Sequence, residues 1–187
     1  MADLNKWMGV VYTSIAKIIG IDYANVNTFM TLTIPAQVVN NRGVFGGGGS
    51  NVISYITIST PGNATDFGDL ISLRSQLAAC SSSTRGVFGG GTTGTNQNIL
   101  DYITISTPGN ASDFGDLTVA RTALFACSSS TRGVFGGGSG PLNTMDYITI
   151  ATTGDATDFG DLSAARYGSG GCSSSTRGVF GGGNIST

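Results

Sequence analysis

The chain has 187 residues, of which 40% are apolar and only 11% are charged, and its formal net charge at neutral pH is −2. It has no histidine and no cluster of basic residues, which argues against a nucleic acid as partner because phosphate neutralisation needs grouped Lys or Arg side chains. No stretch of about 18 apolar residues is present, so we expect no membrane span, and the N-terminus has no basic segment before a long apolar core, so we expect no signal peptide.

The first 29 residues precede the repeats and differ from them. Apolar side chains recur there at a 3-4-4-3 spacing, which is the stripe of an amphipathic helix, although two glycines argue against a long regular one. Such a segment either packs on its own domain or docks on a neighbouring subunit. The stripe consists of Leu4, Trp7, Val11, Ile15 and Ile18.

The remainder, residues 30–187, is repetitive. The words "RGVFGGG" and "YITI" recur, and every tyrosine of "YITI" is followed by the next repeat arginine after 30 residues. The arginines are separated by 43, 47 and 45 residues, so all length variation lies in the loop between the glycines and the tyrosine. The arginines are Arg42, Arg85, Arg132 and Arg177, and the tyrosines are Tyr55, Tyr102 and Tyr147.

Each repeat unit predicts four short strands in chain order. A segment of small residues ending in "CSSS" comes first, followed by "RGVFGG", then the alternating "YITIST", and finally "DFGDL". The "PGNAT" between the last two is typical of a turn. A period of this length with four strands fits a propeller blade better than a solenoid coil, so we predict an all-β fold, with a β-solenoid or a trimeric β-fibre as the alternative.

The units resemble kelch repeats, in which a double glycine ends the second strand, a tyrosine follows a variable loop and an aromatic residue comes later. This family usually has tryptophan at the last position, where this chain has phenylalanine. The resemblance implies three kelch-like blades and the first half of a fourth, with the late aromatic ring wedged between adjacent blades. The remaining positions of the pattern are Gly46, Gly47, Gly89, Gly90, Gly136, Gly137, Gly181, Gly182, Phe67, Phe114 and Phe159.

Longer stretches, "DYITIATTGDATDFGDLSAAR" and the N-terminal "W-x-GV…SIAKI-x-GI", resemble virion proteins of tailed bacteriophages. This resemblance implies a structural virion protein, assembled in the host cytoplasm, that belongs to the tail or an appendage and contacts a host-surface glycan. It also favours the N-terminal stripe of Trp7, Val11, Ile15 and Ile18 as a docking segment for other virion proteins.

The alternative from another class is a soluble carbohydrate-binding or sugar-modifying propeller protein. An enzyme would be expected to carry unique polar insertions in one or two blades, but the variable loops here are short and rich in Gly, Thr, Asn and Ser. Nucleophilic catalysis lacks a histidine base, and the glycine runs lack the lysine of a phosphate-binding loop. We therefore expect neither enzyme activity nor a cofactor.

The "DFGD" aspartates allow two interpretations. Two carboxylates could contribute to a calcium site, but calcium takes six to eight oxygen ligands, so one pair is too few. An arginine follows each pair, so ion pairing between neighbouring blades is the simpler prediction. The aspartates are Asp66, Asp69, Asp113, Asp116, Asp158 and Asp161, and the arginines are Arg74, Arg121 and Arg166.

The cysteines and the N-x-S/T sequences also have structural explanations. Cys80, Cys127 and Cys172 occupy equivalent positions and form an odd set, so we predict reduced, buried thiols rather than a disulfide framework. Asn63, Asn110 and Asn184 head glycosylation sequences, but turn chemistry accounts for them better.

Three and a half units leave open ends. Repeat units bury their apolar faces only against neighbours, and unpaired strand edges invite association. The sequence therefore predicts a homo-oligomer that forms a ring or a polymer, and removal of residues 166–187 is expected to abolish assembly.

Overall fold

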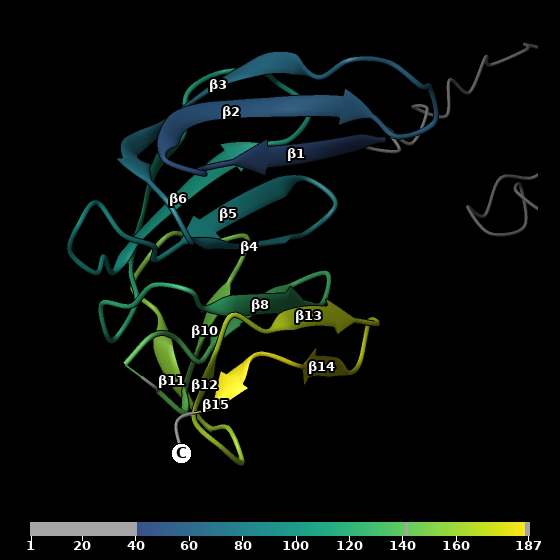
Figure 1. Cartoon of the computed structure of the whole chain (residues 1–187). Helices are drawn as coiled ribbons and strands as arrows, with labels where there is room; N and C mark the ends of the chain where they lie inside the picture. The colour runs from purple at the N-terminus through teal and green to yellow at the C-terminus, as the bar shows by residue number, and fades with distance from the viewer. Residues whose placement is uncertain (1–40, 141, 186–187) are drawn as a thin grey trace, which may run out of the picture. The chain divides into compact units, whose positions relative to one another are not determined.

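The computed structural model describes residues 41–140 and 142–185, which form only β-strands arranged in small antiparallel sheets (Figure 1). The predicted all-β fold is confirmed. No helix in this part of the chain could cross a membrane. The predicted N-terminal segment, residues 1–29 with Trp7 and its apolar stripe, lies outside the described residues.

Two four-stranded sheets reproduce the predicted unit, and the "YITI" strand is the third strand of each. The sheets are ordered β4-β5-β6-β7 and β8-β9-β10-β11, so consecutive strands are neighbours. We call them the second and third units. Their strands are β4 (Ala78–Ser81), β5 (Arg85–Gly89), β6 (Ile99–Thr104), β7 (Ser112–Asp116), β8 (Phe125–Ser128), β9 (Arg132–Gly136), β10 (Thr144–Thr149) and β11 (Thr157–Asp161).

The remaining strands lie before and after these two sheets in the chain. The first unit is the three-stranded sheet β1-β2-β3, whose strands are the equivalents of the second, third and fourth strands of a complete unit. The C-terminal strands form the pairs β13-β14 and β12-β15, and β14 pairs only with β13 among the described residues. Their bounds are β1 (Arg42–Gly46), β2 (Ser50–Thr57), β3 (Thr65–Arg74), β12 (Arg166–Tyr167), β13 (Gly170–Ser173), β14 (Gly178–Gly181) and β15 (Asn184–Ile185).

The glycine run ends the second strand because it can leave the extended conformation. Gly90 has a φ of 64° and Gly137 a φ of 63°, a left-handed region that glycine adopts without steric cost. Their amides bond back to the next strand, where Gly90 N–H donates to the Ile99 carbonyl at 3.0 Å. This hydrogen bond joins the two ends of the variable loop. The length of the loop can therefore change without moving the strands on either side of it.

The hydrophobic core lies between successive units rather than within one sheet. One cluster joins Phe67 of the first unit to Phe88 and Ile103 of the second, and another joins Phe114 of the second to Phe135 of the third. Phe67 and Phe114 are each only 2% exposed, as expected for a ring wedged between neighbouring sheets.

Candidate functional site

The polar and aromatic side chains that recur in the repeats lie at the contacts between successive units. The first of these contacts involves the repeat arginine. Arg85 lies over the ring of Tyr102, 4.3 Å from its centroid, and Tyr102 meets Phe114 edge-on at 6.0 Å. The same guanidinium donates from Nη1 to the Ile150 carbonyl of the following unit at 3.0 Å. Arg85 therefore packs on a tyrosine ring of its own sheet and donates a hydrogen bond to the sheet of the next unit.

The first unit repeats this arrangement. Arg42 lies 4.7 Å from the centroid of Tyr55, Tyr55 meets Phe67 edge-on, and Arg42 Nη1 donates to the Ile105 carbonyl at 2.8 Å. Repeat spacing singled out Arg42 and Tyr55, the resemblance to kelch repeats added Phe67, and the structure brings the three together at a contact between units.

The "DFGD" strand forms a second contact with the turn of the following unit. Gly154 N–H donates to the Phe114 carbonyl at 2.7 Å, and Asp116 N–H donates to Asp155 Oδ1 at 3.0 Å. The backbones are so close that a Cβ on Gly115, whose φ is +138°, would lie 2.5 Å from the Gly154 carbonyl. The glycine of "DFGD" is therefore required by this contact.

The first and second units are joined in the same way. Gly109 N–H donates to the Phe67 carbonyl at 2.6 Å, and Asp69 N–H donates to Asn110 Oδ1 at 3.1 Å. Asn110 thus bonds through its amide oxygen to the preceding unit. Asn63, its equivalent in the first unit, is exposed. Asn184 lies in the strand β15 (Asn184–Ile185), which corrects the turn prediction for that residue.

A buried ion pair forms the third contact. Arg121 Nη2 lies 2.9 Å from Asp146 Oδ2, and both side chains are fully buried. Thr118 donates to the same carboxylate twice, from its backbone N–H to Oδ2 at 3.2 Å and from Oγ1 to Oδ1 at 2.6 Å. Burial lowers the pKa of Arg121, and the opposite charge of Asp146 counteracts this shift. We call this ion pair with its threonine the second latch.

The first latch joins Arg74 to Asp101 at 2.7 Å, and both are again fully buried. Ile71 stands where the second latch has threonine, so it donates only its backbone N–H to Oδ2, at 3.2 Å. Asp101 Oδ1 has no hydrogen-bond partner in the described structure. Burial raises the pKa of Asp101, although the Arg74 charge and the Ile71 N–H act in the opposite direction. The first latch is thus the less satisfied of the two.

The latches correct one sequence prediction. The arginines Arg74 and Arg121 do form ion pairs between units, but their partners are Asp101 and Asp146, not the "DFGD" aspartates. The sequence carried a signal for these partners, because an aspartate directly precedes Tyr102 and Tyr147.

Among the described residues no three metal-ligating side chains gather. The "DFGD" aspartates for which calcium was considered are Asp66, Asp69, Asp113, Asp116, Asp158 and Asp161.

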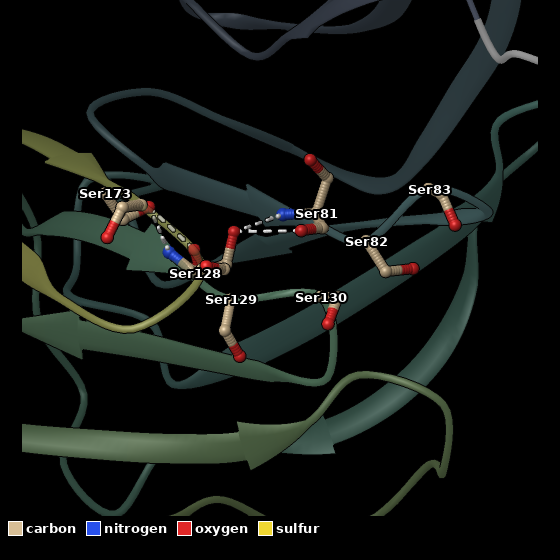
Figure 2. Close-up of a pocket in the computed structure, with 9 residues that line it drawn as sticks. Ser81, Ser82, Ser83, Ser128, Ser129, Ser130 and Ser173 are labelled. Atoms are coloured by element: carbon tan, nitrogen blue, oxygen red, sulfur yellow. Dashed lines mark hydrogen bonds between the residues drawn. The ribbon is translucent and has the colours of Figure 1, made fainter.

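The first strands of successive units form the fourth contact. Ser128 lies between Ser81 and Ser173, and hydroxyl groups bridge the backbones (Figure 2). Ser128 Oγ donates to the Ser81 carbonyl at 2.9 Å, and Ser173 Oγ donates to the Ser128 carbonyl at 2.6 Å. The nine serines of the three "CSSS" segments line a shallow hollow of about 310 Å³ here.

Cysteine side chains accompany the serines. The Cys80 sulfur packs against Gly133 of the next unit. A Cβ at this position would collide with the sulfur, so the glycine leaves space for it. Cys80 and Cys127 are buried and free, as predicted, but Cys172 is exposed, which corrects the prediction for that residue. Burial raises the pKa of the Cys80 thiol to about 12 and also raises the pKa of Cys127. Both thiols are therefore protonated and unreactive at neutral pH.

The third unit presents the same groups, but in the described part of the chain only the pairs β13-β14 and β12-β15 follow it. Phe159 is 47% exposed, and nothing lies within 4 Å of a Cβ on Gly160. Arg132 keeps its place 4.5 Å from the centroid of Tyr147. Arg166 bonds to the Gly182 carbonyl at 3.3 Å and has no carboxylate partner in the described structure. We call this surface the open face: Arg132, Phe159, Gly160, Ser163, Arg166 and the free edge of β14.

The double glycines at the end of the second strand differ between the units in the same way. Gly46 and Gly89 receive a phenylalanine ring from the next unit, Phe88 and Phe135, whereas nothing lies within 4 Å of a Cβ on Gly181 or Gly182. Arg177, the last repeat arginine, is exposed. The predicted docking residues Trp7, Val11, Ile15 and Ile18 lie outside the described residues.

Comparison of the chain with models of protein families and with curated proteins finds no match.

Proposed function

We propose that this chain is a structural virion protein of a tailed bacteriophage, associated with the tail or an appendage, whose units are kelch-like propeller blades. The assignment to virion proteins rests on the sequence resemblance given above, and one structural observation supports a role in assembly. The contacts between the first and second units recur between the second and third, and the same groups stand exposed on the third unit, where Phe159 is 47% exposed against 2% for Phe67 and Phe114. A module that carries its interface chemistry at an exposed end is suited to assembly.

Assembly then uses the open face. The open face presents aromatic, charged and backbone groups together. Inside the chain, the same arrangement joins the first unit to the second and the second to the third. The first unit is also incompletely covered, because Ile58 is 65% exposed while its equivalents Ile105 and Ile150 are 7% and 0% exposed. Binding to other virion proteins is the assembly that we propose for the open face, and the homo-oligomer predicted from the sequence is the alternative that light scattering tests.

The carbohydrate-binding alternative has less support. The serine hollow beside Ser128 is lined by serines alone. The adjoining hollow of about 390 Å³ contains one aromatic ring, that of Phe159, which we assign to the open face. Contact with a host-surface glycan belongs to the proposal as a property of the assembled particle, and no described pocket is assigned to it.

Mass spectrometry of purified particles tests the proposal directly. We expect peptides of this chain at a stoichiometry comparable to tail or appendage proteins, and gold-labelled antibodies should mark that part of the particle. Absence of the chain from washed particles would contradict a structural role.

A truncation tests assembly in the isolated protein. Removal of residues 166–187 takes away Arg166 and β14, and we expect any complexes of the full chain to be lost in light scattering. A matched control replaces the exposed Asp66 of the first unit by Asn. Truncated chains that form the same complexes would contradict assembly through the open face.

A further inference from the structure

The open face contains a site for one particular group, a carboxylate. In the second latch, three donors of the second unit surround the Asp146 carboxylate: Arg121 Nη2, Thr118 N–H and Thr118 Oγ1. Forty-five residues later the chain reads "LSAAR" where the second unit reads "LTVAR", so Ser163 corresponds to Thr118 and Arg166 to Arg121. A hydroxyl and a guanidinium are thus presented again, and Ser163 is exposed.

The free edge of β14 limits the shape of the occupant. In the second and third units the "RGVFG" strand pairs with the "YITI" strand, in the register Val87↔Tyr102 and Val134↔Tyr147. The strand β14 contains the equivalent Val179, which is 53% exposed while Val87 is 0% exposed, and pairs only with β13 in the described part of the chain. An occupant that completes this sheet supplies its third and fourth strands, which together form a hairpin.

We infer that the open face binds a β-hairpin of the repeat type whose third strand carries an aspartate directly before its tyrosine, so that this carboxylate meets Arg166 and Ser163. The inference rests on the proposed function, because it names the kind of partner that the assembly surface takes. The hairpin places a carbonyl at Arg132, a turn N–H at the Phe159 carbonyl and an Asn or Asp side chain at the N–H of Asp161. Each is the equivalent of a bond that already holds the third unit to the second.

A second copy of this chain does not offer such a hairpin at its first unit. The residue before Tyr55 is Ser54, so the carboxylate is missing. In addition, β1 is already paired with β2, and it corresponds to the same strand of the unit as β14. Docking of the first unit would therefore bring two second strands to one position. The occupant is a hairpin from a partner chain with the Asp-Tyr sequence.

A peptide of residues 144–161 serves as the probe, because it is the hairpin that the second unit holds inside this chain. We expect it to bind the full chain in isothermal titration calorimetry. The same peptide with Asp146→Ser, which reproduces Ser54, should bind about tenfold more weakly or worse, because a hydrogen-bonded charge is lost. Protein variants Arg166→Gln and Ser163→Ala should weaken binding of the aspartate peptide and reduce its advantage over the serine peptide. Lys17→Gln changes the net charge equally and should leave the advantage intact.

A linked format covers the case in which the free peptide does not form a hairpin. The same 18 residues, joined to the C-terminus by a flexible linker, should raise the melting temperature of the chain more with aspartate than with serine. Equal effects of the two hairpins in both formats would overturn the inference. So would self-association of the full chain that Arg166→Gln abolishes, because the occupant would then be a second copy. The presence of the chain in particles is measured separately, so the proposed function can stand if this inference fails.

Discussion

The face that the second unit turns toward the third and the face that the third unit leaves open carry nearly the same side chains in opposite environments. Arg121 is fully buried against Asp146, whereas Arg166 reaches only a backbone carbonyl. Phe114 is 2% exposed and Phe159 47%. The difference shows that these residues are built for contact with a following unit and that their burial depends on that unit. Identical substitutions on the two faces should therefore have unequal effects.

The largest difference is expected for the buried latch. Asp146→Ala removes the partner of a fully buried guanidinium, and breaking such a pair costs about 3–5 kcal/mol. The change Arg166→Ala on the open face should cost less than about 1 kcal/mol, because no buried charge loses its partner. The free energy of unfolding from urea titrations measures both. Equal losses for the two variants would contradict the proposed roles of the faces.

The glycines of the two "DFGD" strands provide the next comparison. Gly115 and Gly160 both have positive φ, +138° and +115°, but only Gly115 has the next turn against it. Gly160→Ala should cost about 1 kcal/mol from backbone strain alone, and Gly115→Ala about 3 kcal/mol because the added Cβ also pushes the Gly154 backbone away. Thermal unfolding of the two variants separates the strain from the collision.

The buried thiols should make stability depend on alkaline pH. Burial raises the pKa of Cys80 from 9.0 to about 12, so between these values the unfolded chain ionises while the folded chain does not. The stabilisation from the neutral thiol is complete below pH 9 and lost as pH rises toward 12, with a loss of about 3 kcal/mol by pH 11.

The control for this prediction is Cys80→Ala, which should remove the larger part of the pH dependence and leave the part that Cys127 contributes. Thiol labelling at neutral pH offers a second check, since Cys172 should react rapidly, and Cys80 and Cys127 only after unfolding. Fast labelling of Cys80 in the folded chain would contradict its burial.

The smallest effect sharpens the comparison between the two latches. Ile71→Thr places a hydroxyl where Thr118 has one, next to Asp101 Oδ1, which has no hydrogen-bond partner in the described structure. We expect a gain of about 1 kcal/mol in the free energy of unfolding, because a buried acceptor gains a donor and the isoleucine is already 47% exposed. Ile71→Val is the control without a hydroxyl and should give no gain.

The sequence alone determined the repeat and its strands. The 30-residue distance from tyrosine to arginine fixed the unit, the alternation of "YITI" gave its third strand, and Gly90 and Gly137 ended the second strand because glycine adopts positive φ. Local periodicity and turn chemistry suffice for such features. The late aromatic residue of the unit was expected to lie between neighbouring sheets, and it does so at Phe67 and Phe114 but not at Phe159.

Only the tertiary structure decided which groups meet across units. Asp101 pairs with Arg74 across 27 positions of sequence, while the nearer Asp69 bonds through its backbone to the next turn. Distance along the chain favoured the nearer carboxylate, but the stacking of sheets brought the aspartate of the following unit to the buried arginine. The exposure of Phe159, Arg166 and Cys172 is likewise a tertiary property. Burial depends on what packs against a residue, and equivalent repeats do not have equivalent neighbours.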